Sequence, residues 1–476
     1  MKHVFALSLA AACFGVQPAG AATFTVTTLA DSGAGSLRAA VASANATSGA
    51  DTIRFQPGLA GTILLSTGEI LVSDSLTIEG PGSDTLALSG GGNQRILRLD
   101  GAAGARTTTV LSGLAFEDGQ ASDGGAIYGE DENLVMRDAV LRNNRSVSRG
   151  GAIRLAGGDL TLEGVFLLDN QAGPGNSDTG GAVNHNSGNF VMKRCVVQGN
   201  RANYGGGLYL GTPSPHVVIE DSAFIDNASH YAGGAINAGT TMPSFHVARS
   251  SFIGNSTQEP LGAAVYFGGS VSPGTSPGVI ENSTFSGNFT PHSGGRGIVS
   301  VNSGTLYLRN STLAFNQTAN AQTPSSADGG AVWVGDATLH VDSTVFAHNT
   351  HGAGRVDISP SSYPGRTIHV SDSLLHTTPA AGLINGTDTG NRFDTDAQLL
   401  PLVVEGATLA PVHPIAQDSP AIDAGSNPAG LATDQRGPGY PRTIDFIACR
   451  HPSFARTDAG AYEYRGDTIF CHGFEH

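Results

Sequence analysis

Lysine is almost absent from this sequence. Only Lys2 and Lys193 occur among the 476 residues, and the formal net charge is −15. No cluster of basic residues interrupts this acidity. An acidic surface without basic patches repels phosphate backbones and anionic lipid headgroups. The composition therefore argues against nucleic acid as a partner and against binding to an anionic membrane.

Long apolar runs are also missing beyond the first residues. The segment from Met1 to Ala22 has a basic start, an apolar run from Val4 to Val16 and small residues at a cleavage site. This order is typical of a secretory signal peptide, and the run is too short to span a bilayer. We expect residues 1–22 to be removed during export and no other segment to cross a membrane.

Cysteine is scarce, and three of the four cysteines lie beyond the signal peptide. Cys195 occupies a repeat position that is expected to face inward, so we predict a buried packing residue. Cys449 and Cys471 lie in the C-terminal region. In an oxidising compartment these two can form a disulfide, and we predict that they do.

Glycine, in contrast, is abundant, with 66 residues, and much of it belongs to an internal repeat. A Gly-Gly-Ala-hydrophobe motif and a second motif ending in Asn recur every 25 to 34 residues. A repeat of this length cannot bury its own apolar face and indicates a solenoid. The glycine motif starts at Gly124, Gly150, Gly180, Gly205, Gly233, Gly262 and Gly329, with a degraded copy near Gly295, and the second motif ends at Asn144, Asn170, Asn200, Asn227, Asn255, Asn288, Asn316 and Asn349.

The spacing inside each repeat selects the type of solenoid. Apolar residues recur two positions apart, which is a strand pattern, whereas a helical repeat would show spacings of three and four. Phe224, Phe252 and Phe285 each lie three positions before a repeat asparagine. We therefore predict an all-β fold, a right-handed parallel β-helix of the pectin-lyase-like type with about 11 coils, in which these three rings stack inside.

Charged residues seven positions before the repeat asparagines support the same register. Arg137, Glu163, Lys193 and Glu220 alternate in sign from one repeat to the next. Opposite charges on neighbouring strands are mildly favourable. We expect this alternation to report strand register rather than function.

The two ends of the chain differ from the repeats. Ser36 can cap a short helix with Leu37, Val41 and Ala44 on one face, which would close the open end of the solenoid. We predict a signal peptide at 1–22, an N-terminal cap with irregular coils at 23–119, and regular coils at 120–378. A loop-rich C-terminal cap is predicted at 379–465 and a tail at 466–476.

Three stretches resemble known bacterial families. Residues 35–41, Gly-Ser-Leu-Arg-Ala-Ala-Val, resemble the CSLREA-type N-terminal region, although the Cys and Glu of that motif are absent. The Gly-Gly-Ala and Phe-x-x-Asn motifs resemble the repeats of polymorphic outer-membrane proteins. Residues 419–425, 433–437 and 458–463 resemble a choice-of-anchor C-terminal domain. These resemblances imply an extracellular or outer-surface location in a bacterium.

Three hypotheses for function follow. Many secreted β-helices cleave acidic polysaccharides, but no Asp or Glu cluster beside an Arg and no polygalacturonase-type signature is present. We therefore expect a monomeric, non-catalytic, adhesin-like protein that binds a polysaccharide or a host or cell-surface component. The alternatives are a polysaccharide lyase or glycoside hydrolase and a structural surface spacer. We expect no cofactor, and Ca²⁺ only if the protein is a lyase.

The candidate binding site is a stripe on the strands that follow the Gly-Gly motifs. In each strand an apolar residue comes first, so the next side chain is expected to point outward. These side chains would stack into an external row of aromatic, amide and guanidinium groups suited to an elongated sugar chain. The row consists of Tyr128, Arg154, Asn184, Tyr209, Asn237, Tyr266 and Trp333.

Overall fold

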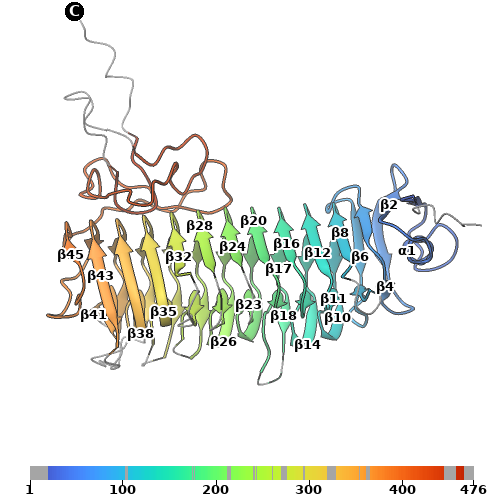
Figure 1. The fold of residues 1–476 in the computed structure, drawn as a ribbon, viewed down its shortest axis with the longest axis horizontal. Helices are drawn as coiled ribbons and strands as arrows, with labels where there is room; N and C mark the ends of the chain where they lie inside the picture. Colours follow the sequence, from blue (N-terminus) through green and yellow to red (C-terminus); the bar gives the residue numbers. More distant parts are fainter. Residues whose placement is uncertain are drawn as a thin grey trace, which may run out of the picture.

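The chain winds into a parallel β-solenoid of about 11 turns, which confirms the predicted fold class (Figure 1). The computed structural model describes residues 20–465 except 102–105, 174, 176, 212–215, 240–241, 243, 260, 270–275, 293–294, 319–328, 353, 361–364 and 444–456. The predicted signal peptide, apart from its last three residues, lies outside the described residues, as do Cys449, Cys471 and the predicted tail. No described helix is long and apolar enough to cross a membrane.

Three parallel sheets, which we name A, B and C, form the walls of the solenoid. A typical coil runs through β13 (Val140–Arg142) in sheet B, β14 (Arg145–Arg149) in sheet C, and β15 (Ile153–Leu155) and β16 (Leu160–Glu163) in sheet A. Each repeat asparagine lies at the corner between sheets B and C. Each Gly-Gly motif lies at the corner between sheets C and A, where Gly150 has a φ of 60°. A left-handed φ of this kind favours glycine.

The strands of sheets B and C are short. Sheet B comprises β3 (Gly61–Leu64), β6 (Leu86–Ser89), β9 (Ala115–Glu117), β13, β17 (Phe166–Leu168), β21 (Val196–Gln198), β25 (Ala223–Ile225), β29 (Ser251–Ile253), β33 (Thr284–Ser286), β36 (Thr312–Ala314), β39 (Val345–Ala347) and β44 (Leu374–Leu375). Sheet C comprises β10 (Gln120–Asp123), β14, β18 (Gln171–Ala172), β22 (Arg201–Tyr204), β26 (Ala228–Ala232), β30 (Ser256–Thr257), β34 (Phe289–Thr290), β37 (Gln317–Thr318), β40 (Thr350–His351) and β41 (Gly354–Arg355).

Sheet A usually takes two strands from each coil. They are joined into one long strand in β35 (Val299–Arg309) and again in β38 (Val332–Asp342). The first strand of each pair follows a Gly-Gly corner and carries the predicted stripe. These first strands are β11 (Ile127–Gly129), β15, β19 (Val183–His185), β23 (Leu208–Leu210), β27 (Ile236–Ala238), β31 (Val265–Phe267) and the beginnings of β35 and β38.

The predicted aromatic stack is present in the core. Phe224, Phe252 and Phe285 occupy paired positions on β25, β29 and β33, and all three are fully buried. Their ring centroids are 4.9 and 4.5 Å apart, and neighbouring rings are within 5° of parallel. The inward register read from the repeat is therefore confirmed.

The repeat asparagines form a buried ladder of amide groups at the corner between sheets B and C. Asn200 donates its main-chain N–H and its Nδ2 to Oδ1 of Asn227, at 3.1 and 2.9 Å. Nδ2 of Asn200 also donates to the carbonyl oxygen of Leu167, at 2.9 Å. The same pattern links successive coils from Asn144 to Asn316, so each amide satisfies backbone groups that the turn leaves unpaired.

A second ladder explains the small residue five positions before each asparagine. The hydroxyl of Ser250 accepts the N–H of Ser222 at 3.2 Å, and the hydroxyl of Ser222 accepts the N–H of Cys195 at 3.1 Å. Cys195 continues the ladder, since its Sγ accepts the main-chain N–H of Val165 at 3.4 Å. Cys195 is fully buried, as predicted.

The alternating charges also lie at paired positions on sheet A. Arg137 and Glu163 are 3.5 Å apart, Lys193 and Glu220 are 3.0 Å apart, and Arg309 and Asp342 are 3.6 Å apart. Pairs of this kind on an exposed surface each stabilise the fold by at most about 1 kcal/mol. They do, however, report the register that the sequence predicts.

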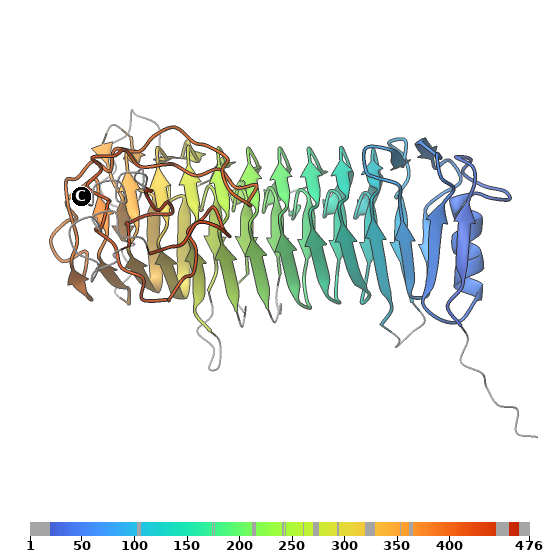
Figure 2. The ribbon, with the colours of Figure 1, turned by 90° about the horizontal axis from the view of Figure 1, so that it is seen from above.

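The N-terminal helix α1 (Leu37–Ala46) lies at one end of the solenoid, as expected (Figure 2). Its buried face contains Leu37, Ala40, Val41 and Ala44, and Oγ of Ser36 accepts the N–H of Ala39. Asp31 ties the helix to the next segment. It pairs with Arg38 at 2.6 Å and accepts four hydrogen bonds from the backbone and hydroxyls of Ser66 and Thr67.

The C-terminal segment, predicted as a cap, divides its role between the end and the flank of the solenoid. Leu383 joins the main core, and β45 (Asp388–Thr389) pairs with the last sheet A strand, β43 (Thr367–Ser371). The chain from about residue 397 then turns back along sheet B of the last coils, as Figures 1 and 2 show. A second apolar cluster lies there, and it includes Ala397, Ile415, Ala421 and Ala459.

Polar contacts fix the same docking. Thr284 bonds Gln435 at 2.6 Å, Ser286 bonds His413 at 2.9 Å, and the N–H of Gly460 donates to the carbonyl of Ser343 at 2.8 Å. The outward residues of sheet B beneath this segment, among them Val345, Ala347 and Leu374, are fully buried. Most of the C-terminal segment is therefore a lateral cover over the last coils.

Candidate functional site

The seven residues of the predicted stripe occupy equivalent positions on sheet A. Strand pairing joins them coil by coil through the whole row, with Ser300 between Tyr266 and Trp333. Tyr128, Tyr209 and Tyr266 are partly exposed. Strand alternation thus placed the row on one line, as the sequence suggested.

The expectation that the whole row is exposed is wrong. Only 4% of Arg154, 1% of Asn184, 6% of Asn237 and 1% of Trp333 is accessible to solvent. Several of these side chains bond to each other or to residues at the corner between sheets C and A. Arg154 donates to Asn184, Asn184 donates to the hydroxyl of Thr179, and the guanidinium of Arg296 lies 5.0 Å from the Trp333 ring centroid.

Arg154 stands out within this row because its charge is not neutralised by direct contact. Its side chain donates hydrogen bonds to the carbonyl of Leu155 and to Asn184, and it forms no ion pair with a residue that the structure describes. Burial lowers the pKa of Arg154, and the neighbouring positive charge of Arg149 lowers it further, while the more distant Asp123 raises it. A buried charged group with a shifted pKa is a candidate functional residue.

Arg149 belongs to a surface on the outer side of sheet C that the sequence analysis did not predict. Arg145 and Arg149 lie on β14, Arg201 lies on β22, and all three side chains are exposed. Gln171 of β18 lies between Arg145 and Arg201 in the same row. Arg201 lies two coils further along the axis than Arg145. At the spacing of parallel strands this corresponds to about 10 Å. We call Arg145, Arg149 and Arg201 the arginine face.

The arginine face differs from most exposed arginines of the coils, which have acidic partners; the buried Arg154 has none among the described residues. Arg142 pairs with Glu117, Arg194 with Glu163, and Arg249 with Asp221, at 2.5 to 2.6 Å. Arg54, Arg137 and Arg309 are likewise paired on sheet A. Within the described part of the chain, no carboxylate pairs with any residue of the arginine face. Asp123 lies opposite Arg149 on the neighbouring strand β10 without forming an ion pair with it, so the three guanidinium groups stay available to an anion although an acidic residue is near.

Aromatic side chains border the arginine face on the following coils. The rings of Tyr204 on β22 and Tyr231 on β26 are stacked, with centroids 5.0 Å apart, and His230 packs edge-on against Tyr231 at 4.3 Å. Both tyrosines are partly exposed. Partly exposed aromatic faces beside hydrogen-bonding groups are suited to the mixed apolar and polar surface of a sugar ring.

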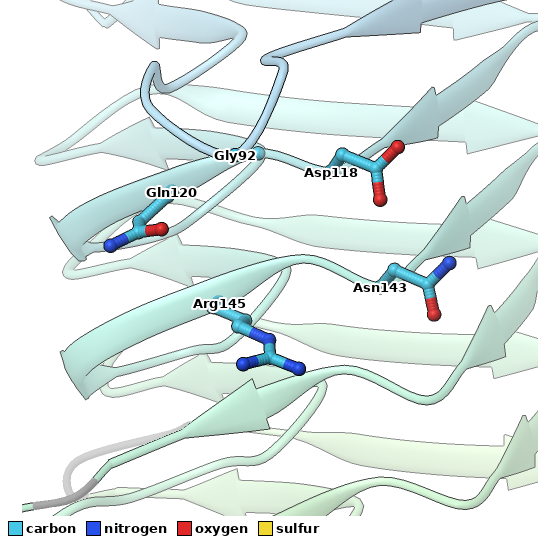
Figure 3. A pocket seen from close by; sticks show the side chains of 6 residues that line it. Gly92, Asp118, Gln120, Asn143 and Arg145 are labelled. Carbon is cyan, nitrogen blue, oxygen red and sulfur yellow. The ribbon is translucent and has the colours of Figure 1, made fainter.

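A hollow of about 340 Å³ opens at the other border of the arginine face. It is lined by Gly92, Asp118, Gly119, Gln120, Asn143 and Arg145. Figure 3 shows Gln120 and Arg145 extending from neighbouring strands of sheet C, while Asp118 and Asn143 come from the turns before them. Both turn residues have a left-handed φ, of 53° and 56°. The hollow therefore extends the polar surface towards sheet B.

One signal in the sequence points to this surface. Arg145 and Arg201 both follow a repeat asparagine directly, and Arg149 precedes a Gly-Gly motif. The repeat therefore places all three on sheet C. The sequence does not reveal which of the other arginines form ion pairs, because those pairs depend on contacts between coils.

No protein-family model matches the chain, and no curated protein matches it. Among solved structures it is similar to a mannuronic-acid-specific polysaccharide family 6 lyase from the human gut microbiota. The sequences are 10% identical, the TM-score is 0.34, and the match covers 78% of this chain and 92% of the lyase.

Proposed function

We propose that the protein binds an acidic polysaccharide along the outer side of sheet C. The observation that carries this proposal is the arginine face, three exposed guanidinium groups without acidic partners on the described part of an acidic protein. A guanidinium presents paired N–H donors that match a carboxylate or a sulfate in two parallel hydrogen bonds. The ligand would therefore carry regularly spaced anionic groups.

The neighbouring residues support an extended sugar chain rather than a small anion. Gln120 and Gln171 alternate with the arginines along the coil axis and supply both donors and acceptors. Tyr204 and Tyr231 add stacked rings at the end of the row. A polymer lying parallel to the solenoid axis would meet one such group per coil.

Retention on immobilised polysaccharides tests the proposal. The triple variant Arg145→Gln, Arg149→Gln and Arg201→Gln keeps hydrogen-bonding side chains but removes the charge. We expect it to lose at least tenfold in affinity for a polyuronate or a sulfated polysaccharide, while neither form is retained by a neutral glucan. The matched control is Arg54→Gln with Arg137→Gln, two exposed arginines that have acidic partners. Equal retention of the triple variant and the unaltered protein would refute the arginine face as the binding site.

Cleavage of such a polysaccharide is a second candidate function. The observation in its favour is the run of Tyr128, Arg154, Asn184 and Tyr209 on four successive coils. In eliminative cleavage of a uronate, a base removes the proton beside the carboxylate, the glycosidic oxygen leaves, and a carbon–carbon double bond forms. A hydroxyl of the partly exposed Tyr128 or Tyr209 would serve in proton transfer. Arg154 and Asn184 are almost fully buried and bonded to each other, so they would have to turn outward to neutralise the carboxylate.

The two functions can be separated directly. Incubation with polyuronates, with and without Ca²⁺, would yield an ultraviolet-absorbing unsaturated product only if elimination occurs. Tyr209→Phe would abolish that product without reducing retention on the arginine face. In either case we propose that the protein is exported and acts outside the cell. Absence of both retention and cleavage in the unaltered protein would leave the structural spacer hypothesis.

A further inference from the structure

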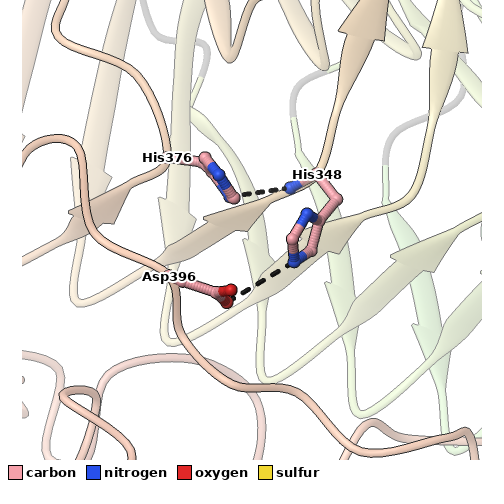
Figure 4. Close-up of side chains that lie close together, drawn as sticks. All are labelled: His348, His376 and Asp396. Carbon is pink, nitrogen blue, oxygen red and sulfur yellow. Dashed lines mark hydrogen bonds and ion pairs between the residues drawn. The ribbon is translucent and has the colours of Figure 1, made fainter.

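Two histidines and one aspartate converge where the C-terminal segment meets the solenoid. Each of His348, His376 and Asp396 offers a ligand atom within 4.8 Å of the others. Nε2 of His348 lies 3.4 Å from Oδ1 of Asp396, and the two imidazole centroids are 4.5 Å apart. Figure 4 shows the two rings and the carboxylate turned towards a common centre.

Three separate parts of the chain supply these groups. His348 follows β39 at a turn position with a φ of 54°, and His376 follows β44 on the next coil. Asp396 belongs to the segment that turns back along the solenoid. The Phe315 ring stacks on His348, with centroids 5.2 Å apart and the rings within 9° of parallel. The coil register therefore positions both histidines, and the segment with Asp396 supplies the third group.

We propose that His348, His376 and Asp396 bind one divalent transition-metal ion of the Zn²⁺, Co²⁺ or Ni²⁺ class, which fastens the C-terminal segment to the last coils. Two imidazole nitrogens and one carboxylate are a ligand set typical of these ions, with water at the remaining position. Ligands to one tetrahedral ion lie about 3.3 Å apart, given bonds of about 2.0 Å. A closure of up to about 1.5 Å at the widest separation, from 4.8 Å to about 3.3 Å, would thus complete the site.

The surroundings of His376 are compatible with a neutral metal ligand. The N–H of His348 approaches its Nδ1 at 3.2 Å, and Nη1 of Arg355 lies 2.6 Å from its Nε2. A neutral imidazole has one acceptor nitrogen, so it accepts only one of these two hydrogen bonds. Ligation through Nε2 therefore requires Arg355 to turn away and the ring to rotate off the His348 N–H. Arg355 is exposed and can turn into solvent when an ion binds.

The carboxylate has an oxygen available for the ion. Oδ1 of Asp396 accepts the N–H of Gln398 at 2.9 Å, which orients the group. The nearby Asp394 is engaged by the backbone and hydroxyl of Thr378, at 3.0 and 2.5 Å. Asp396 is thus the carboxylate that faces the histidines.

Metal titration of the tag-free, full-length protein tests this proposal. After removal of bound metals with a chelator, we expect one Co²⁺ per chain, visible absorption of four-coordinate cobalt, and displacement by Zn²⁺. We expect the melting temperature to rise by several degrees with Zn²⁺. Asp396→Asn, an exposed and nearly isosteric change, should weaken binding at least tenfold, and His348→Ala should abolish the cobalt spectrum.

Two further variants distinguish a metal site from a simple ion pair. Arg355→Gln removes a competing positive charge and should tighten metal binding, which a structural ion pair cannot explain. His369→Gln is the matched control, since His340 and His369 also stack, at 4.3 Å, without such a carboxylate. Absence of a stoichiometric ion, or equal binding by Asp396→Asn and the unaltered protein, would show an ion pair only between His348 and Asp396 and would overturn the proposal.

Discussion

Oδ1 of Asn227 accepts two hydrogen bonds from Asn200 on the preceding coil, one from its main chain and one from its side chain. Nδ2 of Asn227 in turn bonds the carbonyl of Val197 at 2.8 Å. Asn227→Ala would leave several buried groups without partners, at about 1–3 kcal/mol for each unsatisfied group. We expect a loss of about 2–5 kcal/mol in denaturant unfolding. The exposed Asn93→Ala should change stability by less than about 0.5 kcal/mol, and an equal effect of both would contradict the ladder's role.

The aromatic stack gives a prediction about the core. Phe252→Ala removes the middle ring between Phe224 and Phe285, and the transfer and cavity costs together come to about 3–5 kcal/mol. Phe166→Ala provides the control, because Phe166 faces outward from sheet B and is 38% exposed. Urea unfolding should separate the two variants clearly. A loss below about 1 kcal/mol for Phe252→Ala, the size of a surface effect, would argue against tight packing of the stack.

Asp31 predicts a dependence of stability on pH. Burial would raise the pKa of Asp31, but Arg38 and the bonds from Ser66 and Thr67 outweigh this and hold it well below its usual range. Its stabilising contribution is therefore complete above the unfolded pKa of about 4 and is lost as the pH falls further. Asp31→Asn should cost about 1.5–3 kcal/mol at pH 7. The difference from the unaltered protein should shrink towards pH 2, and a difference independent of pH would exclude this charge effect.

The cysteines predict a contrast in chemical labelling. Burial raises the pKa of the Cys195 thiol to about 12, so only about one molecule in ten thousand carries the thiolate at pH 8. We expect Cys195 to react with iodoacetamide only after unfolding. Cys449 and Cys471, predicted to be bonded, should react only after reduction. Mass spectrometry of exported protein checks both, and labelling of Cys449 in native, unreduced protein would refute the disulfide.

The regular coils could be predicted because their determinants repeat within the sequence. Phe252 and Asn227 have equivalents in neighbouring repeats, so strand alternation and a corner position define their surroundings. The burial of Arg154 and Trp333 could not be read in this way, since it depends on contacts across the corner between sheets C and A.

The lateral cover could not be predicted for a similar reason. Val345 and Leu374 lie beneath the cover, yet the early coils hold Val140 and Phe166 at the same outward position of sheet B. Apolar residues at this position therefore do not mark the coils that are covered. Nor do they indicate that Ala397 and Ile415, distant in sequence, belong to the cover.

The docking of the C-terminal segment sets a limit on how this solenoid can vary in length. Coils with an exposed sheet B, such as those of β13, β17 and β21, contact only their neighbours along the axis. One such coil could therefore be duplicated or lost, because the asparagine ladder and the serine ladder would form again between the coils on either side. The coils from β33 onward must also match a fixed series of contacts, from Thr284 with Gln435 to Ser343 with Gly460. Insertions and deletions of whole coils would therefore accumulate in the first half of the solenoid, and the last coils would keep a constant number.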